Sequence, residues 1–337
     1  MNAPAAPGTP LVEVSGLSVR FTGGRAPVQA VSDVNLQVGR GEAVALIGES
    51  GSGKSVTLRT LLMLHDARRT QLAGRVVVDG RDVLAMKESA LCDYRGKVAS
   101  MIFQEPLLAL DPVYTVGAQI VEAIRRHEPV DRATAHQRAL ALFERVRIPS
   151  PERRLAAYPH EMSGGMRQRA MIALALACNP QLLLADEPTT ALDATVQIQV
   201  LILLRELQRD LGLSIVFVTH DIGAALEVAD RIAVMYGGRI VEEGTARQLI
   251  RAPRHPYTLA LLRGRAHGTM DKGQRLLTIP GSPPDLSRPI PGCAFAPRCS
   301  FAQEACHTTL PTPVDLAPGH RARCLRTDAT APDASVT

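Results

Sequence analysis

An apolar run that leads into a glycine-rich loop is the feature that most constrains what this chain folds into. Residues 43–47 have the pattern of a buried strand, and residues 57–64 have that of a helix. The loop before that helix matches G-x-x-x-x-G-K-[ST] at every fixed position, and its residues are Gly48, Glu49, Ser50, Gly51, Ser52, Gly53, Lys54 and Ser55. A chance glycine-rich turn would not need this context of strand, loop and helix. The sequence therefore predicts a site for nucleotide phosphates.

Each part of the loop has a chemical reason. The glycines let the backbone curl until its N–H groups point at phosphate oxygens, and the positive end of the helix dipole adds to the attraction. Lys54 is expected to reach the β and γ phosphates as a point charge, and Ser55 to offer its hydroxyl to Mg²⁺. The loop thus predicts a nucleotide that is bound together with Mg²⁺.

A second apolar run, residues 182–185, ends in the carboxylates Asp186 and Glu187. A carboxylate at the C-terminal end of a buried parallel strand lies beside the phosphate loop in a doubly wound sheet. We expect Asp186 to hold the Mg²⁺ shell and Glu187 to activate the attacking water. A strand that merely ends in polar residues is the alternative, and the phosphate loop earlier in the chain argues against it.

The stretch Ser163-Gly164-Gly165-Met166-Arg167-Gln168-Arg169 precedes a helical run over residues 170–177. It resembles the signature of ATP-binding-cassette ATPases, in the form typical of oligopeptide and dipeptide importers rather than the commoner L-S-G-G-Q. A serine and two glycines at a helix N-terminus make a second anion cradle. The resemblance implies that this cradle serves a nucleotide of a partner chain, in a head-to-tail dimer with two ATP molecules between the subunits.

Four further residues follow the order of the same family. The resemblance implies that Gln104 senses Mg²⁺ and couples to membrane subunits, that Asp193 contacts the opposite subunit, that His220 contacts the γ-phosphate and that Phe21 stacks on adenine. Taken singly, such residues are usually a solvated cap, a hydrogen-bonded edge residue or part of a core. The sequence departs from the family pattern at two positions. Phe21 stands where a tyrosine would be a more electron-rich platform for adenine, and Met166 replaces the signature glutamine.

The site residues that the resemblance implies form three overlapping groups. The catalytic group is Glu187, His220, Lys54 and Gln104. The nucleotide-binding group is Phe21, Gly48, Glu49, Ser50, Gly51, Ser52, Gly53, Lys54, Ser55, Val56, Gln104, Asp186, Ser163, Gly164, Gly165 and Asp193. The Mg²⁺ ligands are Ser55, Gln104 and Asp186.

The resemblance covers residues 11–326 and implies an α/β fold of the ABC-type P-loop NTPases. This fold has a RecA-like core, an antiparallel β subdomain, a helical subdomain and here a small loop-rich C-terminal extension. We expect the nucleotide-binding domain over residues 11–250, its helical subdomain at about 112–165 and the extension over 251–326. Residues 1–10 and 327–337, which are rich in Ala, Pro, Asp and Thr, are expected to be disordered.

An ATPase fold does not decide the function, and three classes compete. A DNA-repair or chromosome-organising ATPase would place a long coiled coil between the phosphate loop and the signature, and this interval lacks sustained heptads. A ribosome-acting ATPase would normally carry a second phosphate loop. An importer ATPase remains, and the resemblance favours di- or oligopeptides as cargo, with nickel or glutathione as alternatives. Cargo choice is expected to lie in other subunits.

The N-terminus has no signal-peptide pattern, and no apolar run is long enough to span a bilayer, so we expect a reducing, cytosolic setting. The resemblance implies a peripheral place on the cytoplasmic face of a bacterial inner membrane. It also implies a second, related ATPase subunit, two permease subunits and an external substrate-binding protein as partners. No nucleic-acid partner is expected. The net charge of +5 weakly favours an anionic partner without choosing one.

The C-terminal part resembles the extension of oligopeptide, dipeptide and nickel importer ATPases. A short helical stretch starts near His255 and Tyr257, and a proline-rich segment with four cysteines follows: Cys293, Cys299, Cys306 and Cys324. The compartment disfavours disulfides, and the spacings of the cysteines do not suit zinc knuckles. A 4Fe–4S cluster is our leading prediction, since some of the importer ATPases that this tail resembles have one. Zinc and unoccupied thiols are the alternatives.

Overall fold

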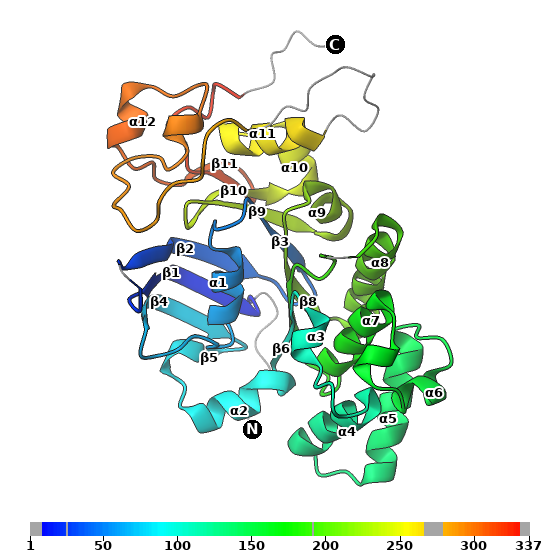
Figure 1. Cartoon of the computed structure of the whole chain (residues 1–337). Helices are drawn as coiled ribbons and strands as arrows, with labels where there is room; N and C mark the ends of the chain where they lie inside the picture. The colour runs from blue at the N-terminus through cyan, green and yellow to red at the C-terminus, as the bar shows by residue number, and fades with distance from the viewer. Residues whose placement is uncertain (1–8, 25, 191, 266–278, 331–337) are drawn as a thin grey trace.

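The computed structural model describes residues 9–24, 26–190, 192–265 and 279–330 (Figure 1). The disorder expected for the two ends concerns mainly residues 1–8 and 331–337, which lie outside the described residues.

An eight-stranded sheet forms the centre, in the order β11-β12-β10-β9-β3-β8-β7-β6. The neighbouring strands β9, β3, β8, β7 and β6 run parallel, while β10, β12 and β11 continue the sheet in antiparallel pairs. The bounds are β3 Ala43–Ile47, β6 Ala99–Ile102, β7 Leu182–Asp186, β8 Ser214–Thr219, β9 Arg231–Tyr236, β10 Arg239–Thr245, β11 Val314–Ala317 and β12 His320–Ala322. This is the parallel core that the sequence predicts.

A second, antiparallel sheet has the order β2-β1-β4-β5. Its strands are β1 Val12–Phe21, β2 Val28–Val38, β4 Thr70–Val78 and β5 Arg81–Asp82, followed by the 3-10 turn η1 Val83–Ala85 and by α2 Glu88–Lys97. The prediction of an α/β fold with an antiparallel β subdomain is therefore confirmed.

Strand β3 shows why the larger sheet lies between two cores. All five of its residues are buried, so the strand has no solvated face. Because side chains alternate along a strand, Ala43, Ala45 and Ile47 join one hydrophobic cluster, while Val44 and Leu46 join the other. The first cluster contains the helices after β6, and the second contains the antiparallel sheet. The carboxyl ends of the parallel strands are thus held firmly from both sides.

Helices occupy the segment between β6 and β7, as the apolar periodicity predicts. They are α3 Pro106–Ala109, α4 Val116–His127, α5 Arg132–Arg145, α6 Pro151–Leu155, the 3-10 turn η2 Pro159–Glu161 and α7 Gly164–Ala175. The hydroxyl of Thr115 accepts a hydrogen bond from the Ala118 N–H at 3.3 Å and begins α4, and Asp131 begins α5 in the same way. Figure 1 shows α4, α5 and α6 gathered on the side of the large sheet away from β1 and β2.

The helix after the phosphate loop differs from its prediction. It was expected over residues 57–64, but α1 spans Lys54–Thr60. It begins early because Lys54 and Ser55 already have helical backbone after Gly53. It ends early because Met63 takes a left-handed conformation with φ of 51°. Lys54 and Ser55 therefore lie in the first helical turn, beside the strand ends.

The rest of the chain returns to the large sheet. Helices α8 Ala194–Leu211 and α9 Ile222–Val228 flank β8, and α10 Ala246–Arg251 and α11 Pro256–Arg265 follow β10. The extension has few regular elements in its described part: η3 Ala296–Arg298, α12 Glu304–Thr308, β11 and β12. It docks by adding β12 to β10 and by a hydrogen bond from the Gln29 N–H to the Leu286 carbonyl at 2.9 Å.

None of the helices within the described ranges is both long and apolar enough to cross a membrane.

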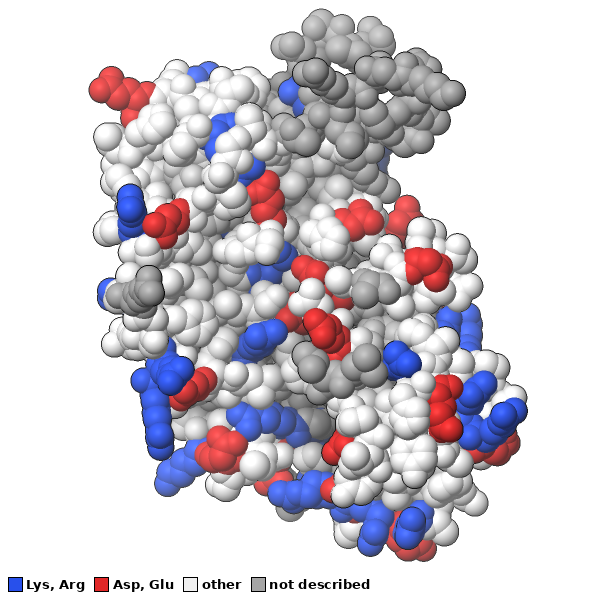
Figure 2. Space-filling model, in the orientation of Figure 1, with Lys and Arg blue, Asp and Glu red and all other residues white. Residues whose placement is uncertain are grey.

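Charges of both signs are interspersed on the face drawn in Figure 2, with acidic side chains near its middle and basic ones along its lower edge. The small positive net charge is therefore not gathered into one continuous basic area on this face.

Candidate functional site

The phosphate loop is built on glycines in conformations that other residues avoid. Gly48, Gly51 and Gly53 have φ values of 152°, 78° and 101°. A Cβ on Gly53 would lie 2.6 Å from the Ala30 carbonyl oxygen, and one on Gly48 would clash with the Met235 carbonyl. Packing therefore demands glycine at both positions, and the loop leaves room for an anion against its backbone.

Lys54 lies inside this loop. Its Nζ donates hydrogen bonds to the carbonyl oxygens of Gly48 and Glu49, each at 2.8 Å. Burial lowers the pKa of the Lys54 ammonium, and the nearby carboxylates of Glu187 and Asp186 act in the opposite direction. A single cation is thus positioned where the loop would hold phosphate oxygens.

Ser55 and Asp186 meet beside the loop. The Ser55 hydroxyl donates to Asp186 Oδ1 at 2.6 Å, and the Arg59 guanidinium lies 3.6 Å from Oδ2. Asp186 is 1% exposed, and burial raises the pKa of its carboxyl although Ser55 and Arg59 lower it. Its Oδ2 has no hydrogen-bond partner among the residues that the structure describes. A hydroxyl beside a buried carboxylate with an open oxygen fits a hydrated Mg²⁺ that is bound with phosphates.

Glu187 is the centre of a second cluster. Its Oε2 accepts hydrogen bonds from Gln104 Nε2 at 3.2 Å and from the Thr190 hydroxyl at 2.8 Å, and His220 Nδ1 lies 3.6 Å away. The Glu187 backbone has a left-handed φ of 46°, and its N–H donates to the Val218 carbonyl. An uncommon backbone held by a strand hydrogen bond is typical of functional sites. The ends of β6, β7 and β8 bring these side chains together.

Two residues of this site were missed by the sequence reasoning. Thr190 donates a hydrogen bond to Glu187. Its position only three residues after Glu187 in the sequence could have indicated this contact. Arg59 lies one helical turn after Ser55 and therefore on the same face of α1, beside Asp186. Both positions follow from short-range geometry once Ser55 and Glu187 are identified.

Phe21 lies at the end of β1 and packs edge-on against His65, with ring centroids 5.6 Å apart. It is half-buried and covers part of the core beneath the antiparallel sheet. The ring therefore lies at the rim of the antiparallel sheet, whereas the phosphate loop follows strand β3 of the larger sheet.

The predicted signature lies elsewhere on the molecule. Ser163 begins α7, where its hydroxyl accepts a hydrogen bond from the Met166 N–H at 3.3 Å, and Asp193 begins α8 by accepting from the Val196 N–H at 3.0 Å. A Cβ on Gly165 would lie 3.0 Å from Val196, so these two helix starts are close together. Both capping side chains bond within their own helices rather than to the phosphate loop of the same chain.

The iron–sulfur prediction is wrong, and so are the metal-binding terms that rest on it. Within the described ranges, no group of three or more His, Cys, Asp or Glu side chains could hold a metal ion. The cysteines concerned are free: Cys293, Cys299, Cys306 and Cys324. Burial raises the pKa of the Cys324 thiol to about 11 and also raises the pKa of the Cys293 and Cys299 thiols. Burial is the largest cause of each rise, and neighbouring cysteines add to it.

Backbone hydrogen bonds, rather than a metal centre, hold the cysteine segment together. The Cys293 N–H donates to the Cys306 carbonyl at 2.8 Å, and a Cβ on Gly292 would clash with that same carbonyl. The Sγ atoms of Cys306 and Cys324 accept hydrogen bonds from nearby backbone N–H groups. Spacing along the sequence could not show how these thiols are buried or which backbone groups bond to them.

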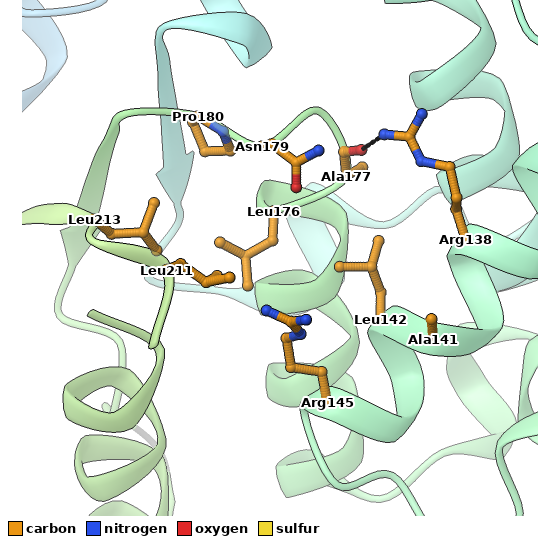
Figure 3. Close-up of a pocket in the computed structure, with 10 residues that line it drawn as sticks. All are labelled: Arg138, Ala141, Leu142, Arg145, Leu176, Ala177, Asn179, Pro180, Leu211 and Leu213. Carbon is orange, nitrogen blue, oxygen red and sulfur yellow. Dashed lines mark hydrogen bonds between the residues drawn. The ribbon is translucent and has the colours of Figure 1, made fainter. Parts of the chain in front are cut away.

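A pocket between α5, the end of α7 and the loop before β8 is separate from this site (Figure 3). Two arginines of α5, Arg138 and Arg145, line it together with apolar side chains such as Leu176 and Leu213. Arg138 is bound through both Nη atoms to Glu128 and through one of them to the Ala177 carbonyl. Its charge is therefore already paired, and the pocket shares no residue with the phosphate-loop cluster.

Comparison with family models gives two matches along the chain. Residues 31–190 match the model described as ABC transporter. Residues 241–306 match the model described as oligopeptide/dipeptide transporter, C-terminal region. The first match contains the phosphate loop, the signature and the carboxylate pair, and the second contains the start of the extension.

Whole-length relatives give the same result. A Brucella melitensis protein named for peptide import and ATP binding is 48% identical over 329 residues, which cover 94% of this chain and 97% of that protein. A Sinorhizobium fredii protein named as a peptide ABC transporter ATP-binding protein is 46% identical over 319 residues, covering 94% and 95%.

A solved structure shows the same fold. The ATP-binding cassette MJ0796, described as a dimer in a post-hydrolysis state bound to ADP and Pi, has a TM-score of 0.63 and 29% identity. The match covers 70% of this chain and 99% of that one, so most of the remaining length of this chain has no counterpart there.

Proposed function

The chain belongs to the ABC transporter ATP-binding proteins, and from that membership we propose how its residues work as the ATP-hydrolysing subunit of a peptide importer. The observation that carries the mechanism is the pair of adjacent carboxylates at the end of β7. Asp186 is joined to Ser55 of the phosphate loop, and Glu187 accepts hydrogen bonds from Gln104 and Thr190 beside His220. One carboxylate faces the phosphates and the other faces the place of the attacking water.

The phosphates of ATP bind in the loop from Gly48 to Val56. Backbone N–H groups and the Lys54 ammonium hold the β and γ phosphates, and Phe21 supports the adenine at the rim. Lys54 changes its carbonyl partners for phosphate oxygens when the nucleotide enters. This exchange needs little movement, because the ammonium already lies inside the loop.

Mg²⁺ neutralises charge on the β and γ phosphates when it is bound. The Ser55 hydroxyl, Asp186 and Gln104 would hold it. The buried Oδ2 of Asp186, which has no hydrogen bond to any described residue, supports this assignment. Arg59 lies beside the same oxygen and lowers the pKa of Asp186, against the larger effect of burial.

Glu187 orients the attacking water and takes its proton. Gln104 and Thr190 hold the carboxylate by one oxygen, which leaves the other oxygen available for water. His220, which is largely exposed in the single chain, contacts the γ-phosphate and steadies its geometry.

A second ATPase subunit completes the site in this proposal. Ser163, Gly164, Gly165 and Asp193 bind the nucleotide of the opposite subunit, and the dimeric state of the MJ0796 cassette supports this arrangement. The exposed helix starts of α7 and α8 suit such a contact, since their own chain does not bring them to its phosphate loop. The partner is a related chain rather than a copy.

Transport is coupled through the permease subunits. The Gln104 segment and the helical subdomain, residues 112–165, dock on them at the cytoplasmic face of the bacterial inner membrane. An external binding protein delivers the peptide to the permeases. The domain over residues 11–250 supplies the ATPase and the extension over 251–326 completes the subunit. The names of the relatives and the C-terminal family match support peptides as the cargo.

Glu187→Gln tests the proposed base. Turnover should fall by about 100-fold to 1,000-fold while ATP binding is retained, because the amide cannot take a proton. The measurement is phosphate release by the assembled transporter, with ATP affinity determined in parallel. Glu227→Gln, which makes the same change at an exposed residue of α9, is the matched control and should leave turnover unchanged. Near-normal turnover in Glu187→Gln would remove Glu187 from this place in the mechanism.

A further inference from the structure

The phosphate-loop residue Glu49 forms an ion pair with a residue of the C-terminal extension. Arg298 Nη1 donates to Glu49 Oε2 at 2.6 Å, and Nη2 donates to Oε1 at 3.0 Å. The two residues are 249 positions apart. Two parallel N–H···O bonds fix the direction as well as the distance of the carboxylate. The extension therefore contacts the nucleotide-binding loop by a bidentate ion pair.

Arg298 is itself held rigidly. Its Nε donates to the Pro280 carbonyl at 2.8 Å, Nη2 donates to the Ile279 carbonyl at 3.1 Å, and Nη1 donates to the Tyr236 hydroxyl at 3.0 Å. Its guanidinium also lies over the rings of Tyr236 and Phe295, and the side chain is only 6% exposed. A buried, fully bonded guanidinium loses little further freedom when it fixes a partner.

The backbone of Glu49 is held from the same direction. Its N–H donates to the hydroxyl of Tyr257 at 2.8 Å, and Tyr257 is fully buried near the start of α11. The ring of Tyr257 packs against Tyr236 and Phe295, whose centroids lie 4.5 and 5.3 Å away. Both the side chain and the N–H of Glu49 are thus bound by one aromatic cluster that includes Arg298.

The charge of Glu49 matters for an anionic substrate. Its carboxylate is close enough to Lys54 to act on the pKa of that ammonium. An uncompensated negative charge at this distance would repel the triphosphate and would compete for Lys54. Arg298 supplies the compensating charge and also keeps the carboxylate turned toward the extension. A loss of Arg298 would therefore affect the loop through both electrostatics and geometry.

We infer that Arg298 is a positioning residue for ATP, through which the C-terminal extension holds the phosphate loop in its binding conformation. The inference rests on the ATP site of the proposed function and is independent of the cargo. It gives the extension a part in nucleotide binding that its sequence does not suggest, because the two partners meet only in the folded chain.

The test uses the purified full-length chain, with ATP titrated in the presence of Mg²⁺ and binding followed by calorimetry. Arg298→Ala should raise the Kd for ATP by about fivefold to tenfold. Arg298→Lys keeps the charge but loses the fork and should raise the Kd by about two- to threefold. Arg288→Ala, at an arginine whose side chain is 83% exposed in the same extension, is the control and should leave the Kd unchanged.

The decisive measurement adds Glu49→Gln to Arg298→Ala. The double variant should recover most of the lost affinity, because the charge that opposes ATP is gone. General damage to the extension would lower the melting temperature without such a rescue. An unchanged Kd in Arg298→Ala, or no recovery in the double variant, overturns the inference. Where Arg298→Ala does not fold, an unchanged Kd in Arg298→Lys overturns it. A wild-type chain that binds no ATP counts against the proposed function instead.

Discussion

Two carboxylates of the large sheet, Asp186 on β7 and Glu242 on β10, are equally buried but differ in their partners. Each residue is 1% exposed. Asp186 accepts one hydrogen bond at Oδ1, from Ser55, and its Oδ2 has none among the described residues. Glu242 Oε1 accepts from the Arg254 N–H at 2.7 Å and lies 2.8 Å from His320 Nε2. Its Oε2 accepts from the His255 N–H at 2.8 Å.

The difference distinguishes a carboxylate that can bind a ligand from one that links segments of the fold. A buried carboxylate with an open oxygen costs stability until a ligand supplies the missing partner. A carboxylate with both oxygens bonded is already satisfied and joins the segments that donate to it. Glu242 thus ties the start of α11 and strand β12 to the sheet, while Asp186 keeps one oxygen open, as the proposed Mg²⁺ site requires.

Asp186→Asn should produce the largest effect of these variants, and it should change turnover and stability in opposite directions. Turnover should fall by about 100-fold or more, since a neutral amide is a poor Mg²⁺ ligand. The unliganded chain should become slightly more stable, by up to about 1 kcal/mol, because burial raises the Asp186 pKa and the ionised group is disfavoured at neutral pH. ATPase rates and urea unfolding without nucleotide measure the two effects. Asp210→Asn, at an exposed residue of α8, is the control. A destabilised Asn variant would contradict the comparison.

Glu242→Gln should do the reverse. It should lower the free energy of unfolding by about 3 kcal/mol, because the buried donors around it lose a charged acceptor. The Kd for ATP of the folded variant should change by less than about twofold, since Glu242 touches no residue of the phosphate loop. Urea unfolding and an ATP titration provide both numbers. Equal stability of Glu242→Gln and wild type would show that the network around Glu242 does not join the extension to the sheet.

His255 should make the stability of the region around Glu242 depend on pH. It is 1% exposed, its Nδ1 accepts from the Tyr257 N–H, and burial lowers its pKa to about 4, against the effect of Glu242. Between about pH 6.5 and 4 the unfolded chain binds more protons at this residue, so stability should fall as the pH falls through this window. The loss should reach about 3 kcal/mol at most.

His255→Asn offers the matched variant for this prediction. Its Oδ1 can accept the same helix-start hydrogen bond, but it does not titrate. Unfolding midpoints measured from pH 7 to pH 4 should decline less steeply in His255→Asn than in wild type. Parallel curves for the two proteins would mean that the acid sensitivity comes from other groups.

Local motifs explain why the sequence could predict which residues of the candidate ATP site lie close together. Gly48 to Ser55, the Asp186–Glu187 pair and His220 each follow a buried apolar strand, and parallel strands end at the same edge of a sheet. Their meeting place therefore follows from strand order, and the structure brings Gln104, Glu187 and His220 together. Thr190 and Arg59 escaped notice because ordinary residue types carry little signal on their own.

The contacts of the C-terminal extension could be predicted less well from the sequence, for a physical reason. It has few strands or helices, so neither periodicity nor strand order predicts which residues meet. The cysteines suggested an iron–sulfur cluster, but across the described residues there is no group of side chains that could hold a metal ion. The pairing of Arg298 with Glu49 also had no signal in the sequence.

The sequence by itself determined the phosphate loop, the apolar strand segments and the order of the residues that follow them, because these are patterns within short stretches of the chain. Tertiary structure alone decided which buried carboxylate stays open, how the thiols are buried and how Arg298 reaches Glu49. These depend on burial and on contacts between distant segments, and such contacts exist only after the chain has folded.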